Sequence, residues 1–237
     1  MNRYMSFEGL ATLESAGTSP ASRVTSGSSE GTVNQELRLV QSLFLLPGKA
    51  CPKSVAFTSV DPGSGVSTVA AGAAINLAKH ATGRVCLVDG SLRRPSLHTR
   101  FGLSGLRGFA EAVLESGAIE EFVQSTEHRN LKVLTAGFHL SDPSSILSSE
   151  RLKSRFAELS SKFDHVLLDV PALRTHPDSM LLARLADGVV LVVEAGVTRR
   201  ERAIKCKKML DETGVKLLGA VLNKRDFPIP DFVYRQL

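Results

Sequence analysis

A glycine-containing stretch at residues 61–68 reads Asp-Pro-Gly-Ser-Gly-Val-Ser-Thr and follows an apolar run rich in β-branched residues. Glycines let a backbone curl so that successive N–H groups point inward, and a helix that begins here adds partial positive charge. This chemistry binds phosphate, and the Ser67 hydroxyl is placed to ligate magnesium. The predicted phosphate-binding residues are Gly63, Ser64, Gly65, Val66, Ser67 and Thr68.

The match to a phosphate-binding loop is incomplete at two positions. A strict P-loop has a glycine where this chain has Val60 and a lysine where it has Val66. Taken alone, the stretch fits an ordinary strand-to-helix turn equally well.

Three further apolar runs end in polar side chains: VCLVD at Asp89, HVLLD at Asp169 and GAVLN at Asn223. A carboxylate at the end of a strand can hold a metal-bound water or orient a nucleophile, and Asp169 suits a second-sphere magnesium ligand. The amide of Asn223 can bind an adenine edge through a donor and an acceptor. Singly, each also fits a turn-forming residue.

Short β-branched runs alternate with longer amphipathic segments from residue 54 onward. We predict strands over 54–59, 84–88, 131–134, 165–169, 189–193 and 216–222, and helices over 67–79, 106–116, 149–161, 178–185 and 199–212. This pattern indicates an α/β fold with a mostly parallel central sheet flanked by helices on both faces. Ligands bind beyond the carboxyl ends of such strands, where all four polar motifs fall.

The first 32 residues differ in composition from the rest of the chain. Ser, Thr and Gly supply 13 of the 22 residues from 11 to 32, which is too little apolar surface to offset the entropy of ordering. We therefore expect a disordered tail over 1–32 and a single domain over 33–237, opening with an amphipathic helix over 33–46.

No apolar run reaches the ~18–20 residues that span a bilayer, and residues 1–10 lack the apolar core of a signal peptide. Three unclustered cysteines are typical of reduced thiols, so we expect a cytoplasmic protein. The basic run Arg199–Lys208 predicts a helix with Ala203, Cys206 and Leu210 on its inner face. Its basic side is either a solvated surface or a docking surface for nucleic acid or an acidic partner.

Taken together and in this order, the motifs resemble the bacterial tyrosine kinases of capsule and exopolysaccharide assembly. These CpsD/CapB-like proteins form a branch of the MinD/ParA-type P-loop ATPases, and the resemblance covers residues 33–225. The stretches RRPSLHTRFGL and LTAGFHLSDPSSILSSE are specific to the polysaccharide branch. The resemblance implies a P-loop NTPase architecture that binds ATP or ADP with Mg²⁺.

Site roles also follow from the resemblance. It implies that Asp89 and Asp169 are catalytic, that Ser67, Asp89 and Asp169 hold Mg²⁺, and that Asn223 contacts adenine. It further implies a partner at the inner face of the cell membrane, either a polysaccharide co-polymerase adaptor or an active kinase paralogue.

The chain departs from the family pattern in its catalytic motifs. Val66 replaces the loop lysine, and Ser91 replaces the second aspartate of a pair in which Asp89 remains. A charge-assisted hydrogen bond contributes roughly 1.5–3 kcal/mol, so loss of the lysine weakens phosphate binding by about ten- to a hundredfold.

Two further departures concern assembly and phosphorylation. The family's oligomer helix reads Glu-x-x-Arg-x-x-Arg, whereas this chain has Gln35, Arg38 and Gln41, which weakens the case for a homo-oligomer. The family ends in a tyrosine cluster, but here Tyr234 is the one candidate phosphate acceptor near the C-terminus.

These departures favour a degenerate kinase-like protein that regulates polysaccharide polymerisation or export with weak or no catalysis, a pseudokinase. The alternative is an active ATP-dependent autokinase that tolerates Val66. A third interpretation, a ParA-like positioning ATPase that binds DNA through Arg199–Lys208, is disfavoured by the polysaccharide-specific stretches.

Overall fold

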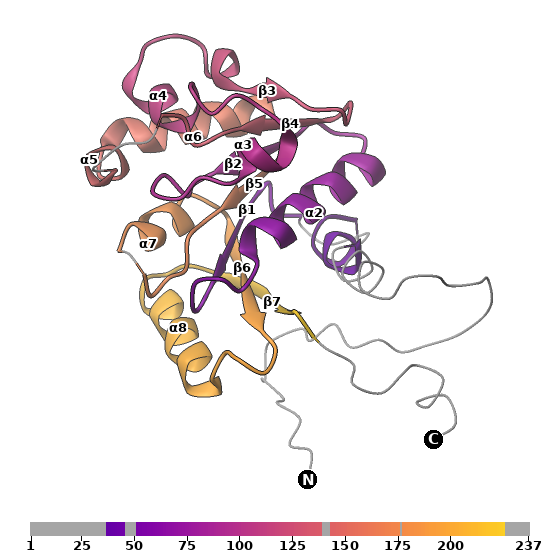
Figure 1. Ribbon diagram of the computed structural model, residues 1–237, viewed down its shortest axis with the longest axis vertical. Helices are drawn as coiled ribbons and strands as arrows, with labels where there is room; N and C mark the ends of the chain where they lie inside the picture. The colour runs from indigo at the N-terminus through magenta and orange to yellow at the C-terminus, as the bar shows by residue number, and fades with distance from the viewer. Residues whose placement is uncertain (1–36, 46–50, 139–142, 176, 226–237) are drawn as a thin grey trace, which may run out of the picture.

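A seven-stranded sheet forms the centre of the computed structural model, which describes residues 37–45, 51–138, 143–175 and 177–225 (Figure 1). The strand order is β3-β4-β2-β5-β1-β6-β7, and every pairing is parallel except that of the edge strand β3 with β4. The expected α/β architecture is thereby confirmed. Because β1 lies between β5 and β6, the loop after β1 is in the middle of the carboxyl edge.

The strands are β1 Ser54–Ser59, β2 Val85–Asp89, β3 Gln124–Ser125, β4 Leu131–Leu134, β5 His165–Asp169, β6 Gly188–Glu194 and β7 Leu217–Asn223. The α-helices are α2 Val66–His80, α3 Leu97–Phe101, α4 Phe109–Leu114, α5 Ser144–Leu147, α6 Glu150–Lys162, α7 Asp178–Ala183 and α8 Arg200–Glu212. A π-helical turn, η1, covers Gln41–Leu45, and a 3₁₀ turn, η2, covers Ile119–Phe122.

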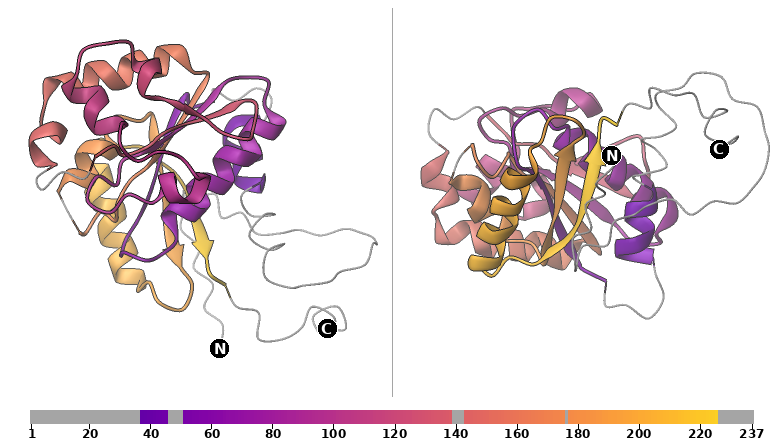
Figure 2. Two further views of the ribbon diagram at one scale, coloured as in Figure 1. Left: turned by 45° about the horizontal axis from the view of Figure 1, so that its top comes forward. Right: turned by 90° about the horizontal axis from the view of Figure 1, so that it is seen from below.

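The central strands bury both of their faces. Ala56 packs into one apolar layer with α4 to α8, whereas its neighbours Val55 and Phe57 pack into the other layer with α2 and α3. Figure 2 shows the sheet between these two groups of helices. Alternation with a period of two sends successive side chains to opposite layers, so a strand covered on both sides reads as a continuous apolar run.

The six predicted strands all form, with bounds that differ by at most one residue. The helix predicted over 106–116 is shorter because the chain before Phe109 is held against the end of β4, where the Phe109 N–H donates to the Thr135 carbonyl at 2.7 Å. The sequence pattern did not predict β3, α3, α5 and η2, all of which are too short to show a period.

Several predictions fall outside the described residues, namely the tail over 1–32, Gln35 and the acceptor Tyr234. In the part that is described, residues 37–45 are helical, and Arg38 and Gln41 are exposed there. No helix of the described chain is long and apolar enough to cross a membrane.

Leu77 on α2 gives a test of the layer that supports the loop. Its side chain is fully buried, whereas Leu106 is 71% exposed. Leu77→Ala should lower the free energy of unfolding by about 2–5 kcal/mol, because it removes buried methyl groups and leaves a cavity. Leu106→Ala, the same chemical change at the surface, should stay near wild type. Urea denaturation measures both, and equal effects would contradict the described packing.

Candidate functional site

The loop between β1 and α2 has the backbone conformation that its glycines permit. Gly63 and Gly65 have φ values of 85° and 86°, in the left-handed region that side chains disfavour. A Cβ at Gly65 would lie 2.3 Å from the Nδ2 atom of Asn223, so this position also lacks space for any side chain. The first N–H groups of the 15-residue helix α2 have no intrahelical acceptor and lie directly after this turn.

Three hydrogen bonds fix the shape of this loop. The hydroxyls of Ser59 and Ser64 both donate to the Asp61 carbonyl, at 2.8 and 2.9 Å. Asn223, buried at the end of β7, donates from Nδ2 to the Ser64 carbonyl at 2.8 Å. Asn223 therefore lies at the carboxyl edge of the sheet and holds the loop backbone with its amide, a contact that the sequence did not predict; its adenine contact stays a prediction.

The side chain of Asp61 is neutralised from outside the loop. Arg174, after β5, donates to Oδ1 at 2.7 Å, and Arg202 on α8 lies 3.4 Å from the same carboxylate. The loop sequence contains no basic residue, so the sequence analysis missed both partners, which are 113 and 141 residues away in the chain. The two arginines hold the start of the loop against the β5–α7 connection and α8.

Helix α8 has the orientation that its pattern predicts. Ala203, Cys206 and Leu210 are buried, and the basic residues lie on the outer side. Two of these, Lys207 and Lys208, pair with acids one turn further along the same helix. This internal pairing favours a solvated surface over a nucleic-acid interface.

Asp89, at the end of β2, is fully buried and accepts three backbone hydrogen bonds. The N–H groups of Ser91, Ser96 and Leu97 donate to its carboxylate at 3.0–3.1 Å. Burial raises the pKa of Asp89, while these three N–H groups act in the opposite direction. The carboxylate thus organises the turn into α3; its catalytic and metal-binding roles stay predictions.

Asp169 ends β5 directly beside Asp89, its register partner across the two parallel strands. Its side chain is buried, and Oδ2 has no hydrogen-bond partner among the described residues. Burial and then the negative charge of Asp89 raise the pKa of Asp169 to about 7, against the opposing effects of the Ser67 hydroxyl and Arg100. Ser67 and Asp169 are thus brought together, as the sequence predicts.

Val66 is partly buried and packs against the apolar layer that includes Leu77. Its side chain therefore adds packing at the first turn of α2 where a P-loop has a cation. Ser91, in place of the second aspartate, uses its hydroxyl to donate to the Arg94 carbonyl at 3.0 Å. Neither substitution restores the charge that the family pattern has at that position.

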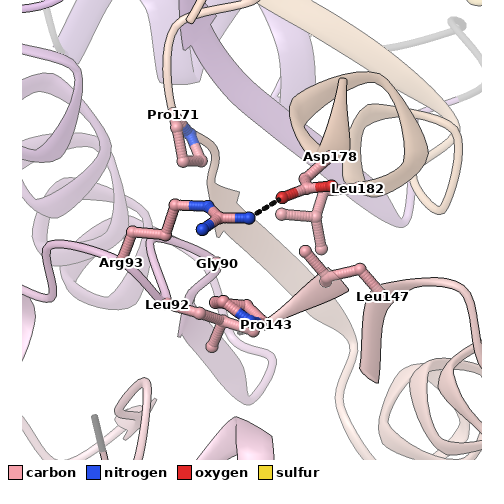
Figure 3. Close-up of a pocket in the computed structure, with 8 residues that line it drawn as sticks. All are labelled: Gly90, Leu92, Arg93, Pro143, Leu147, Pro171, Asp178 and Leu182. Atoms are coloured by element: carbon pink, nitrogen blue, oxygen red, sulfur yellow. Dashed lines mark hydrogen bonds and ion pairs between the residues drawn. The ribbon is translucent and has the colours of Figure 1, made fainter. Parts of the chain in front are cut away.

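Arg93 is engaged away from the loop, in a cavity of about 10 Å³ that Figure 3 shows. Its guanidinium reaches across the cavity to Asp178 on α7 at 2.9 Å, and it also donates to the Ser144 hydroxyl at 3.1 Å. The cavity is close to the lower limit for one water molecule and far too small for a nucleotide. The wall residues are Gly90, Leu92, Arg93, Pro143, Leu147, Pro171, Asp178 and Leu182.

The donor set suits magnesium rather than a metal held mainly by protein side chains. The described residues contain no group of three His, Cys, Asp or Glu side chains that could hold a metal. Magnesium bound with a nucleotide takes one or two protein oxygens and completes its shell with phosphates and water. The unpartnered Oδ2 of Asp169 beside the Ser67 hydroxyl fits that requirement.

Curated relatives identify the family. Tyrosine-protein kinase YwqD of Bacillus subtilis (strain 168) is 38% identical over 171 residues, which are 72% of this chain and 72% of the relative. The CapB protein of Staphylococcus aureus is 30% identical over 196 residues, which are 82% of this chain and 86% of CapB. The chain belongs to the bacterial tyrosine-protein kinase family.

Solved structures of other proteins have a similar fold. The chimerical protein CapA2B2 is 30% identical, with a TM-score of 0.75 over 81% of this chain and 84% of that one. The VpsO kinase domain is 28% identical, with a TM-score of 0.76 over 83% and 95%. MinD from Pyrococcus horikoshii, complexed with Mg-ADP, is 20% identical with a TM-score of 0.61, which shows the fold alone. No protein-family model matches the chain.

The raised pKa of Asp169 predicts a pH-dependent stability. The ordinary pKa is 3.8 and the folded value is about 7, so the folded protein retains a proton that the unfolded chain releases. The Asp169 carboxyl therefore destabilises the fold increasingly as pH rises from about 4 to about 7. With a chelator present, the stability of Asp169→Asn relative to wild type should rise by on the order of 1–4 kcal/mol over that interval and then level off.

Asp164→Asn provides a control of opposite sign for these urea titrations. The Arg84 N–H donates to Asp164 at 2.7 Å and lowers the pKa of this exposed carboxyl. Its stabilising contact is therefore lost as pH falls, so Asp164→Asn should match wild type in acid and be less stable at neutral pH. A flat difference for Asp169→Asn would contradict the described burial.

Proposed function

We propose that the protein is a regulatory member of the tyrosine-kinase family that binds ATP or ADP with Mg²⁺ weakly and lacks efficient phosphoryl transfer. The observation that carries this proposal is Val66, the first residue of α2, whose side chain packs against the apolar layer where the family has a lysine. The loop backbone and the start of α2 retain the features that bind phosphate. The lost cation weakens binding but leaves these N–H groups in place.

Catalysis depends on the missing charge more strongly than binding does. Removing one preorganised donor that stabilises the transition state typically costs on the order of 10²–10³ in rate. Ser91 provides no second carboxylate, and three backbone N–H groups occupy Asp89. These features together support a pseudokinase.

Ser67 and Asp169 are the residues that would hold Mg²⁺, which when bound neutralises charge on the phosphates. Asp169 contributes a buried oxygen that no protein group occupies among the described residues, and Ser67 contributes its hydroxyl. Because the pKa of Asp169 is about 7, the bound metal must displace a proton in part of the population at neutral pH.

The regulatory role would act through docking at the inner face of the cell membrane. The family resemblance supports two partners: a polysaccharide co-polymerase membrane adaptor and an active kinase paralogue. The effect would be on the length or export of a capsular or extracellular polysaccharide. The protein itself would remain cytoplasmic and peripheral.

Calorimetric titration with ATP and with ADP, each with and without Mg²⁺, tests the binding part. Wild type should bind weakly and require Mg²⁺, and Val66→Lys should bind about ten- to a hundredfold more tightly because it restores one charge-assisted contact. Val197→Lys, a change of the same type at a 62% exposed valine, is the control for added charge. Absence of binding by wild type would contradict nucleotide binding by this protein.

An active autokinase is the second candidate, and the unpartnered Asp169 oxygen next to Ser67 favours it. Incubation with labelled ATP distinguishes the two. We expect no label on Tyr234 in wild type at long times, because the loop lacks its cation. Label that appears in wild type and is lost in Tyr234→Phe would contradict the pseudokinase and establish the autokinase.

A further inference from the structure

Arg100 is a cation at the site that the sequence motifs did not indicate. Three other arginines at this edge of the sheet are engaged with carboxylates: Arg174 and Arg202 with Asp61 of the loop, and Arg93, away from the loop, with Asp178. Arg100 differs, since it forms no ion pair with a carboxylate of the described residues. Its Nη2 atom donates to the Thr68 hydroxyl at 2.8 Å, at the first turn of α2.

Buried groups fix the position of Arg100. Helix α3 begins at Leu97, whose N–H donates to the Asp89 carboxylate, and the Leu97 side chain is fully buried. Phe101 packs against the same apolar layer as Val66. The guanidinium is therefore delivered to the loop by a short helix that is anchored at both ends, while the Arg100 side chain itself is exposed.

The charges around Arg100 favour an anion as a ligand. The beginning of a 15-residue helix carries partial positive charge, so a cation placed there is unfavourable unless an anion contacts both. Near Ser67, the buried Oδ2 of Asp169 has no hydrogen-bond partner among the described residues and favours a cation or a proton. A polyphosphate bound with a divalent cation satisfies both requirements at once.

We propose that Arg100 binds a phosphate group of the nucleotide at the start of α2 and replaces the loop lysine that Val66 has lost. The cation thus comes from α3 rather than from the loop. Arg100 also acts on Asp169, whose pKa it lowers, which places its charge within electrostatic reach of the metal-binding carboxylate. This inference rests on the proposed nucleotide binding and adds the residue responsible for it.

Calorimetry with Mg·ADP tests the assignment. Arg100→Gln should weaken binding by about ten- to a hundredfold, the effect of one charge-assisted hydrogen bond. Arg129→Gln removes the same charge from an exposed arginine before β4, at the opposite edge of the sheet, and should leave the affinity near wild type. Urea denaturation of each variant verifies that the fold is retained.

A rescue variant separates phosphate binding from a structural role. In the Arg100→Gln background, Val66→Lys should increase the affinity by a larger factor than it does in wild type, because the lysine then supplies a charge that Arg100 no longer provides. A merely structural Arg100 predicts the same factor in both backgrounds, and that result would overturn the assignment. Equal affinities for Arg100→Gln and wild type would overturn the assignment of Arg100 alone. Binding by Val66→Lys but none by wild type would overturn both this assignment and the proposed function.

Discussion

Two buried carboxylates at the ends of neighbouring strands set the electrostatic constraint on which the site depends. Asp89 and Asp169 are register partners, and both side chains are buried. Two negative charges so close together and out of contact with water are unfavourable. The protein resolves this by an unequal distribution of hydrogen-bond donors. Asp89 receives three backbone N–H groups, whereas Asp169 keeps one oxygen without a partner and a pKa of about 7.

This unequal distribution has consequences beyond the two acids. The N–H groups that stabilise Asp89 include the first ones of α3, so the same carboxylate that carries the charge also places Arg100 at the loop. Asp169, which lacks such donors, remains available to a ligand. The two buried acids therefore differ in their hydrogen bonding, even though they look equivalent in the sequence.

The fold also accommodates a valine at the position of the loop lysine. Val66 joins the apolar layer beneath α2, where a valine side chain adds buried surface and no unsatisfied charge. Asp61, at the start of the same loop, carries a negative charge that Arg174 and Arg202 neutralise from the opposite layer. The charge at the start of the loop is thus balanced by residues from other elements.

The fold and the location of the site could be predicted from sequence because both depend on local patterns. Buried parallel strands read as apolar runs, and the polar residues that end them must meet at one edge of the sheet. The partnerships at the site could not be predicted, since Asp61 with Arg174 and Thr68 with Arg100 depend on how distant segments pack. The short elements β3, α3 and α5 also escaped prediction, because so few residues show no period.

The bond from Asn223 to the Ser64 carbonyl joins residues 159 positions apart, which has a consequence for biosynthesis. The loop is encoded early, but β1 is flanked by two strands that are made later, and the amide that holds the loop comes from the last strand. During translation, the ribosome must therefore release nearly the whole domain before this loop can close. Until β5 and β6 have been made, the apolar β1 also lacks its neighbours in the sheet, so nascent chains expose a strand that is prone to aggregate.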